Sequence, residues 1–157
     1  MKHMEINDLI SSNVVVANLK ATSKKQVLQD LSRRVADATG LHERAIFDVL
    51  MERERLGTTG VGNGIAIPHG KLPELDRLHG HFARLEQPVH FQSIDERPVD
   101  LIFLLLAPES AGADHLKALA KVSRVLRDDS ICEKLRGTDT SDALYAILTG
   151  SVEHQAA

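Results

Sequence analysis

The chain has 157 residues, of which 43% are hydrophobic and 26% are charged, and its formal net charge at pH 7 is −3. This length and apolar content fit one globular domain, and the nearly balanced charge argues against a nucleic-acid or membrane-surface binder. No apolar run approaches the roughly 20 residues of a membrane span, and the N-terminus has no hydrophobic signal core, so we expect a cytoplasmic protein without membrane insertion.

The N-terminal part of the chain predicts a helical turn, a strand and a helix. The turn is expected within residues 1–12, and the β-branched run Val14–Val16 predicts a short strand. A helix then begins after Thr22 or Ser23, either of which is a suitable N-cap, and Gly40 stops it.

A second helix, predicted over residues 43–55, carries a positive charge on its apolar face. At about 100° per residue, Arg53 falls on the same side as Ile46 and Leu50. A guanidinium is not buried without a partner. The pattern leaves two alternatives open. Arg53 either emerges at a cleft and meets an anion, or it follows the edge of the core and pairs with a local carboxylate.

Glycines dominate the next segment, Gly57–Gly64, which contains four of them in eight residues. They permit positive φ and close approach of the backbone, but the spacing matches neither a Walker loop nor a dinucleotide fingerprint. A short strand is predicted over residues 65–67 and is ended by Pro68, so His69 is expected at a strand terminus that faces a cleft. A lone Pro-His pair by itself is more typical of a surface loop.

The second half of the chain predicts three more strands and a helix. Residues 78–87 and 89–91 are expected to be separate strands, and the apolar run 99–107 is typical of a central strand that is covered on both faces. A helix begins near Asp114, which places His115 in its first turn on the flank of the buried face. The inward residues of this helix are expected to be Leu116, Leu119, Ala120, Ser123 and Leu126.

Two short helices are predicted near the C-terminus, over residues 131–135 and 142–148. The first contains the single cysteine, Cys132, which excludes an internal disulfide and is expected to be buried. Because strands and helices alternate around a buried strand, the chain is expected to form one α/β layered sandwich over residues 1–150. Residues 151–157 are expected to be a disordered tail.

Two histidines are candidates for phosphoryl chemistry. A neutral imidazole at a strand end, as expected for His69, can act as a nucleophile toward a phosphoryl group. Arg53, backbone N–H groups of the glycine-rich segment and the helix N-terminus at His115 could supply the positive potential that such a group needs. A zinc site is the alternative, but no further ligands are spaced near these histidines. His79 and His81 are interpreted as a solvated edge.

Three stretches of the chain resemble the enzyme IIA domains of the bacterial phosphoenolpyruvate phosphotransferase system, of the mannitol/fructose type and above all of its nitrogen-regulatory branch. They are Gly57–Lys71, which contains the specific Ile-Pro-His-Gly segment, Pro98–Pro108 and Asp114–Ser123. The resemblance implies an α/β layered sandwich in which a mixed β-sheet is flanked by helices on both faces. It implies neither a metal nor an organic cofactor.

The resemblance also assigns roles to individual residues. His69 matches the phosphorylated histidine, His115 the second active-site histidine and Arg53 the arginine before the glycine-rich loop. Thr59 and Gly60 match the loop that lines the phosphate site. Phosphate is then expected to arrive from an HPr-type histidine phosphocarrier, which enzyme I charges from phosphoenolpyruvate.

Two functions fit this resemblance and differ in the use that is made of the phosphorylated protein. In the first, the chain is a regulatory IIA protein whose phosphorylation state controls targets such as potassium transport components or sensor kinases. In the second, it is a sugar-specific IIA component that passes phosphate to a IIB partner. The chain shows no fused IIB domain with a reactive cysteine, which favours the regulatory function. A purely metal-binding or structural module ranks below both.

Overall fold

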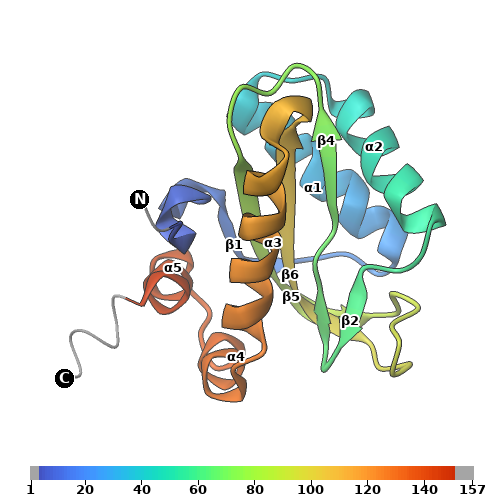
Figure 1. The fold of residues 1–157 in the computed structure, drawn as a ribbon. Coiled ribbons are helices and arrows are strands. Elements are labelled where there is room, and N and C mark those ends of the chain that lie inside the picture. Colours follow the sequence, from blue (N-terminus) through green and yellow to red (C-terminus); the bar gives the residue numbers. More distant parts are fainter. Residues whose placement is uncertain (1–3, 151–157) are drawn as a thin grey trace.

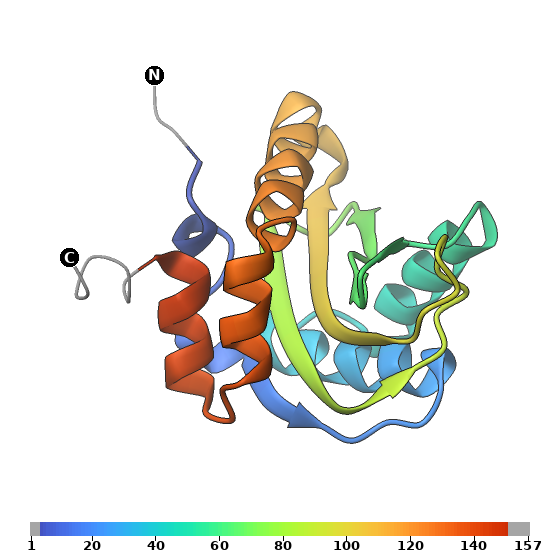
Figure 2. The same cartoon turned by 90° about the horizontal axis from the view of Figure 1, so that it is seen from below.

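The computed structural model describes residues 4–150 and shows a six-stranded mixed sheet between two layers of helices (Figures 1 and 2). The predicted tail over residues 151–157 therefore lies outside the described residues. The strands are β1 (Val15–Leu19), β2 (Gly60–Gly62), β3 (Ile65–Ala66), β4 (His69–Leu72), β5 (His79–Val89) and β6 (Val99–Pro108). The helices are η1 (Ile6–Asp8), η2 (Ser12–Val14), α1 (Lys24–Thr39), α2 (Glu43–Arg55), η3 (Glu109–Ala111), α3 (Ala113–Leu126), α4 (Asp129–Arg136) and α5 (Ser141–Thr149).

The sheet has the order β1-β5-β6-β3-β2, with β4 also paired to β6. β1 is parallel to β5, β5 is antiparallel to β6, and both β3 and β4 are parallel to β6. The expected mixed sheet is therefore confirmed. One strand prediction is wrong: residues 78–87 and 89–91 do not form two strands, because β5 runs without a break to Val89 and changes register after Arg84.

β6 is the central strand and is buried on both faces, as its apolar run predicts. Leu101, Phe103 and Leu105 belong to a core that they share with α3, α4 and α5. Ile102 and Leu104 alternate with them and belong to a second core with α1 and α2. Figure 2 shows these helices on the two sides of the sheet. This two-sided burial places the C-terminal end of β6 between α2 and α3.

The first two long helices follow the sequence prediction closely. The Ser23 hydroxyl caps α1 by accepting a hydrogen bond from the Gln26 N–H at 3.2 Å, and Gly40 ends the helix with φ 78°. α2 spans the predicted residues 43–55. The helical turn predicted within residues 1–12 is present as the 3₁₀ helix η1, and a second 3₁₀ helix, η2, follows it before β1.

The inward face of α3 differs from the prediction. His115, Ala118, Val122 and Leu126 are its buried residues, whereas Leu116 is 68% exposed. Ala120, another residue predicted to face inward, is exposed too. The buried stripe is rotated by one residue because His115 itself takes an inward position in the first turn. His115 is therefore buried, rather than lying on the flank of the buried face.

Strands β3 and β4 are two parts of one line that runs along β6. Ile65 pairs with Leu101 and His69 pairs with Leu105, so the register is the same before and after the interruption at residues 67–68. The Pro68 carbonyl accepts a hydrogen bond from the Leu105 N–H at 2.9 Å. The strand predicted over residues 65–67 ends at Ala66, before Pro68, as expected, and the proline carbonyl still pairs because proline removes only the N–H donor. His69 lies at a strand terminus, as predicted, at the start of β4.

A glycine lets α2 approach β4. A Cβ atom built at Gly70 would overlap the Cγ1 atom of Val49 on α2. This contact lies one residue after His69 and one helical turn before Arg53. The missing side chain at Gly70 therefore sets how near the C-terminal end of α2 comes to the start of β4.

An arginine near the end of the chain fastens the turn between β2 and β3. Arg136 of α4 forms an ion pair with Asp100, with Nε 2.9 Å from Oδ2, and donates from Nη2 to the Asn63 carbonyl at 2.7 Å. Asn63 has φ 57°, and the Gly64 that follows has φ 79°, as a tight hairpin turn requires. The hairpin is thus held by a helix that is distant in the sequence.

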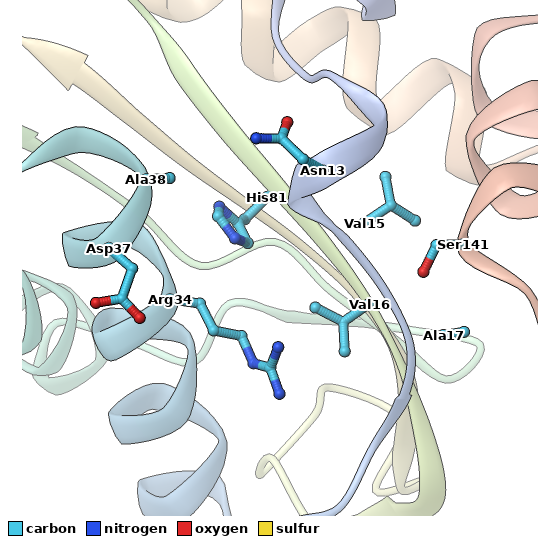
Figure 3. Close-up of a pocket in the computed structure, with 9 residues that line it drawn as sticks. All are labelled: Asn13, Val15, Val16, Ala17, Arg34, Asp37, Ala38, His81 and Ser141. Atoms are coloured by element: carbon cyan, nitrogen blue, oxygen red, sulfur yellow. The ribbon is translucent and has the colours of Figure 1, made fainter.

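His81 is buried and His79 is half-buried, which overturns the prediction of a solvated edge. His81 is 3% exposed, and its Nδ1 lies 3.1 Å from His79 Nε2. The edge strand β1 and helix α1 cover this part of β5, so its side chains do not face open solvent. His81 also lines a hollow of about 390 Å³ that Arg34 and Asp37 of α1 enclose from one side (Figure 3).

The hollow keeps His81 in its neutral form. Burial, together with the neighbouring His79 and the positive charge of Arg34, lowers the pKa of His81 to about 3. Burial also lowers the pKa of His79. Protonation of this pair therefore opposes folding.

The close contact at Gly70 makes a first prediction. Gly70→Ala is expected to destabilise the fold by about 1–3 kcal/mol, because the added methyl group displaces Val49 and with it α2. Gly137→Ala is the matched control, since a Cβ atom there meets nothing nearer than 3.6 Å. Urea denaturation of both variants measures the difference in the free energy of unfolding. Equal midpoints would show that α2 can shift to make room for the methyl group without loss of stability.

The neutral state of His81 makes a second prediction. Stability is expected to fall as the pH drops below 6.5, because the unfolded chain then binds a proton that folded His81 excludes down to a pH of about 3. One such group contributes up to about 1.4 kcal/mol per pH unit. His81→Gln should flatten the pH dependence between pH 6.5 and 5 in thermal or urea unfolding, whereas exposed His42→Gln should not. An unchanged slope in His81→Gln would contradict this account.

Candidate active site

His69 is held by a backbone carbonyl group that faces away from β6. Its Nδ1 lies 2.8 Å from the Ile67 carbonyl oxygen. The Ile67 N–H donates at 3.0 Å to the Thr59 carbonyl in the glycine-rich segment. Both polar groups of Ile67 are therefore used outside the pairing with β6, and one of them orients the imidazole.

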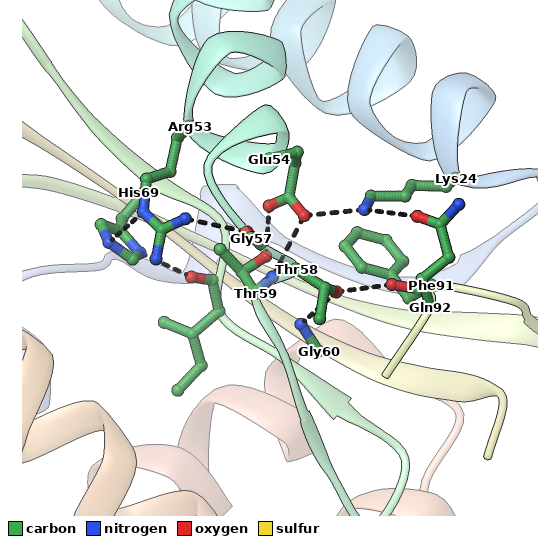
Figure 4. A network of polar contacts seen from close by, with 11 residues as sticks. Lys24, Arg53, Glu54, Gly57, Thr58, Thr59, Gly60, His69, Phe91 and Gln92 are labelled. Atoms are coloured by element: carbon green, nitrogen blue, oxygen red, sulfur yellow. Dashed lines mark hydrogen bonds and ion pairs between the residues drawn. The ribbon is translucent and has the colours of Figure 1, made fainter. Parts of the chain in front are cut away.

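These contacts define which nitrogen of His69 carries the lone pair. A carbonyl oxygen only accepts hydrogen bonds, so Nδ1 carries the proton in the neutral ring. The other nitrogen, Nε2, lies 3.2 Å from Arg53 Nε, which only donates. The Ile67 carbonyl and Arg53 are therefore compatible with the same tautomer of His69, in which Nδ1 carries the proton. Nε2 thus carries a lone pair that faces the guanidinium of Arg53 (Figure 4).

Arg53 is half-buried and is held by backbone rather than by a carboxylate. Its Nη1 donates to the Gly57 carbonyl at 2.9 Å, and its Nε reaches His69. No carboxylate within residues 4–150 forms an ion pair with it. Of the two alternatives for Arg53, the structure therefore does not support pairing with a local carboxylate. The positive charge remains available to an anion at Nε2.

His115 approaches the same imidazole from the other side of the sheet edge. The ring centroids of His69 and His115 are 5.8 Å apart, with an angle of 69° between the ring planes. His115 is 7% exposed, and its Nε2 has no hydrogen-bond partner among the described residues. A buried polar atom without a partner is costly. An anion placed between the two rings would satisfy it.

Burial keeps both histidines neutral. It is the main cause that lowers the pKa of His69, with the charge of Arg53 acting in the same direction. Burial also lowers the pKa of His115, and His69 and Lys71 add to this effect. Neutral rings at pH 7 are what nucleophilic attack by His69 requires.

The other two predicted site residues lie farther back in the loop. Thr59 is 3% exposed, and both its N–H and its hydroxyl donate to the Glu54 carboxylate, the N–H at 3.1 Å. The Gly60 N–H donates to the Thr58 hydroxyl at 3.0 Å. Contact of Thr59 or Gly60 with phosphate stays a prediction, because their donors here bind protein groups.

Sequence reasoning missed Glu54, which is the buried charged residue next to the site. Its side chain is only 4% exposed and forms an ion pair with Lys24 at 2.8 Å. A signal was present, since Glu54 follows Ile46 and Leu50 at steps of four residues, and all three are buried in α2. The prediction followed the charge of Arg53 and overlooked the carboxylate one position later.

Metal binding and thiol chemistry are the alternatives to histidine chemistry in this region. Within residues 4–150, no three His, Cys, Asp or Glu side chains gather in a way that could hold a metal ion. Cys132 is 3% exposed, as predicted, and burial raises the pKa of its thiol. In this part of the chain no helix has the length and apolar character needed to cross a membrane.

Comparison with known proteins places the chain in a family. A family model described as "Phosphoenolpyruvate-dependent sugar phosphotransferase system, EIIA 2" matches residues 8–151. A nitrogen regulatory protein of Bradyrhizobium diazoefficiens is 56% identical over 145 residues, which are 92% of this chain and 95% of that protein. The nitrogen regulatory protein of Escherichia coli K12 is 38% identical over 148 residues, with 93% and 90% covered.

The fold agrees with this assignment. The crystal structure of nitrogen regulatory protein IIA-Ntr from Neisseria meningitidis superposes with a TM-score of 0.87 at 35% identity, covering 92% of this chain and 99% of that one. The chain therefore belongs to the EIIA 2 family of the phosphoenolpyruvate-dependent phosphotransferase system and is similar over nearly its whole length to the nitrogen regulatory proteins of that family.

Proposed function

We propose that the chain is a phosphoryl carrier that accepts a phosphoryl group on Nε2 of His69. The observation that carries this proposal is the lone pair on Nε2, which is fixed by the Ile67 carbonyl on one side and faces Arg53 on the other. The nearby His115 Nε2 lacks a partner within the described chain and can donate to a phosphate oxygen. Phosphoryl transfer depends mostly on such positioning and charge.

The step conserves atoms and charge. The lone pair of His69 Nε2 attacks the phosphorus of a donor phosphohistidine that is protonated on its other ring nitrogen. The nitrogen–phosphorus bond of the donor breaks, and its electron pair returns to the donor imidazole, which leaves neutral. The proton of His69 stays on Nδ1, which is hydrogen-bonded to the Ile67 carbonyl, so the phosphorylated ring carries the positive charge. Arg53 then faces the phosphate.

The proposed donor is an HPr-type histidine phosphocarrier that enzyme I charges from phosphoenolpyruvate. A protein donor needs an accessible acceptor, and His69 is only half-buried. Two exposed leucines border the site. Leu116, 68% exposed, is next to His115, and Leu56, 81% exposed, is next to Gly57, which binds Arg53. Exposed apolar side chains of this kind support docking of another protein.

We further propose that phosphorylation serves regulation. The support is the 56% identity to a nitrogen regulatory protein over 95% of that protein's length. In this proposal the phosphate state of His69 controls binding to target proteins, for which potassium transport components and sensor kinases are candidates. The alternative is transfer to a IIB component. The mannitol IIA of Escherichia coli, which shares the fold at 19% identity, has been solved in complex with phosphorylated IIBMtl.

Loss of the acceptor is the direct test. His69→Ala should remove phosphate acceptance and leave the fold intact, because the substitution deletes Nε2 but no core contact of β6. Intact-mass spectrometry after incubation with phosphoenolpyruvate, enzyme I and an HPr-type carrier measures this. An acid-labile gain of one phosphoryl group is expected on wild type only. A labelled His69→Ala protein would overturn the assignment of the acceptor.

The supporting charges give a separate prediction. Arg53→Ala should slow acceptance by about 10²–10³-fold, as expected when one donor to a developing charge is removed. His115→Ala should slow acceptance or shorten the lifetime of the phosphorylated protein. Arg55→Ala is the matched control, because Arg55 lies on the same helix but is exposed and pairs with Glu52. If quench-flow rates of Arg53→Ala and His115→Ala both equal that of wild type, neither residue contributes to phosphate acceptance and only His69 remains of the proposed site.

A further inference from the structure

The carboxylate of Glu54 is buried directly behind the site. Its side chain is 4% exposed and lies between α1, α2 and the glycine-rich segment (Figure 4). Oε1 accepts hydrogen bonds from the Thr59 N–H at 3.1 Å and from Lys24 Nζ at 2.8 Å, and Oε2 accepts one from the Thr59 hydroxyl. A buried carboxylate persists only when its oxygens are paired in this way.

A chain of hydrogen bonds connects this carboxylate to the ring of His69. Glu54 accepts from the Thr59 N–H, the Thr59 carbonyl accepts from the Ile67 N–H at 3.0 Å, and the Ile67 carbonyl accepts from His69 Nδ1 at 2.8 Å. These contacts fix the main chain at Thr59 and Ile67, and so they fix where the Ile67 carbonyl lies relative to the ring of His69. The negative charge of Glu54 acts on that ring through space, in the direction that raises the pKa of His69 and favours the proton on Nδ1.

A second connection reaches Arg53. The Glu54 carbonyl accepts from the Gly57 N–H at 3.1 Å, and the Gly57 carbonyl accepts from Arg53 Nη1 at 2.9 Å. Residues 57–59 are thus fastened to Glu54 at both ends, by its main chain at Gly57 and by its side chain at Thr59. The loop that aims the guanidinium is the loop that the carboxylate holds.

We infer that Glu54 is a positioning residue for phosphoryl transfer, which acts through Thr59 and Ile67 to hold the proton on His69 Nδ1 and through Gly57 to aim Arg53. The part about rates rests on the proposed function. The part about the proton on His69 does not, because it concerns the unphosphorylated protein.

The negative charge, and not only the shape, of Glu54 matters in this account. The phosphorylated ring of His69 carries a positive charge with its proton on Nδ1, and the negative charge of the buried Glu54 carboxylate stabilises that charge through space. In the free protein burial lowers the pKa of His69, and the charge of Glu54 opposes this shift. The positive charge of Lys24 partly cancels the negative charge of the Glu54 carboxylate. The Lys24 ammonium also donates to Gln92 at 3.1 Å and lies 4.8 Å from the centre of the Phe91 ring.

Glu54→Gln tests the inference, because it keeps the shape and removes the charge. Glu52→Gln is the matched control on an exposed position of the same helix. The readouts are the ¹⁵N shifts of the His69 ring as a function of pH, which report its tautomer and pKa, and the rate of phosphoryl acceptance. In Glu54→Gln we expect a lower pKa of His69, a smaller share of the Nδ1–H tautomer and acceptance slowed at least tenfold, with no change in Glu52→Gln.

Lys24→Met supplies a test of opposite sign. It keeps an unbranched apolar side chain against Phe91 but removes the charge that attenuates Glu54, so the pKa of His69 should rise. If Glu54→Gln fails to fold, the direction of this shift decides.

A wild-type tautomer and pKa in folded Glu54→Gln, or a pKa of His69 that does not rise in Lys24→Met, would overturn the inference. Wild type that accepts no phosphate would instead overturn the proposed function, and the ring shifts of His69 would still decide the role of Glu54.

Discussion

The hydrogen bond between His69 Nδ1 and the Ile67 carbonyl is the constraint on which the site depends. Alternate residues along β3 and β4 face β6, and the Gly64 and Pro68 carbonyls accept hydrogen bonds from its Leu101 and Leu105 N–H groups. Ile67 therefore faces away from β6, toward the glycine-rich segment. There its N–H donates to the Thr59 carbonyl, while the Thr59 N–H is taken by Glu54. The Ile67 carbonyl is thus left as a fixed partner for the imidazole.

The elements around this hydrogen bond bring a positive charge, a negative charge and a neutral ring close together. α2 ends in a cation and a buried anion side by side, Arg53 and Glu54, and the loop after the helix separates their roles. Arg53 faces the open side, where a phosphate would enter, and Glu54 faces the core. α3 adds His115, whose pKa is lowered by burial, so that its ring is neutral at pH 7. The positive charge of Arg53 thus lies on the side of His69 Nε2, and the negative charge of Glu54 lies on the other side of the glycine-rich segment.

Much of the fold could be predicted from the sequence, because local signals and burial agreed. The Ser23 cap, the Gly40 stop and the apolar run of β6 each marked an element that the structure contains. The errors arose where tertiary contacts decide. Coverage of β5 by α1 and β1 buried His81, and the inward position of His115 rotated the face of α3 away from Leu116.

The candidate site was predictable where a residue type is rare in its setting, as with His69 after Pro68 or Arg53 on an apolar helix face. Backbone groups give no such signal. Nothing in the sequence indicates that the Ile67 carbonyl leaves the sheet, or that the Thr59 carbonyl receives the Ile67 N–H. These bonds result from the register of strands that are distant in the chain. Glu54 did have a periodic signal, but an acidic residue at a helix end is usually solvated.

The hydrogen bond from Arg136 to the β2–β3 turn has a consequence for folding during synthesis. The hairpin carries Thr59 and Ile67 on its two arms, while the arginine that closes it comes from α4, 73 residues after Asn63. A nascent chain that still lacks α4 would contain His69, Arg53 and Glu54 but not the clasp that fixes the hairpin between them. The surroundings of His69 would therefore be fixed only after α4 has been synthesised.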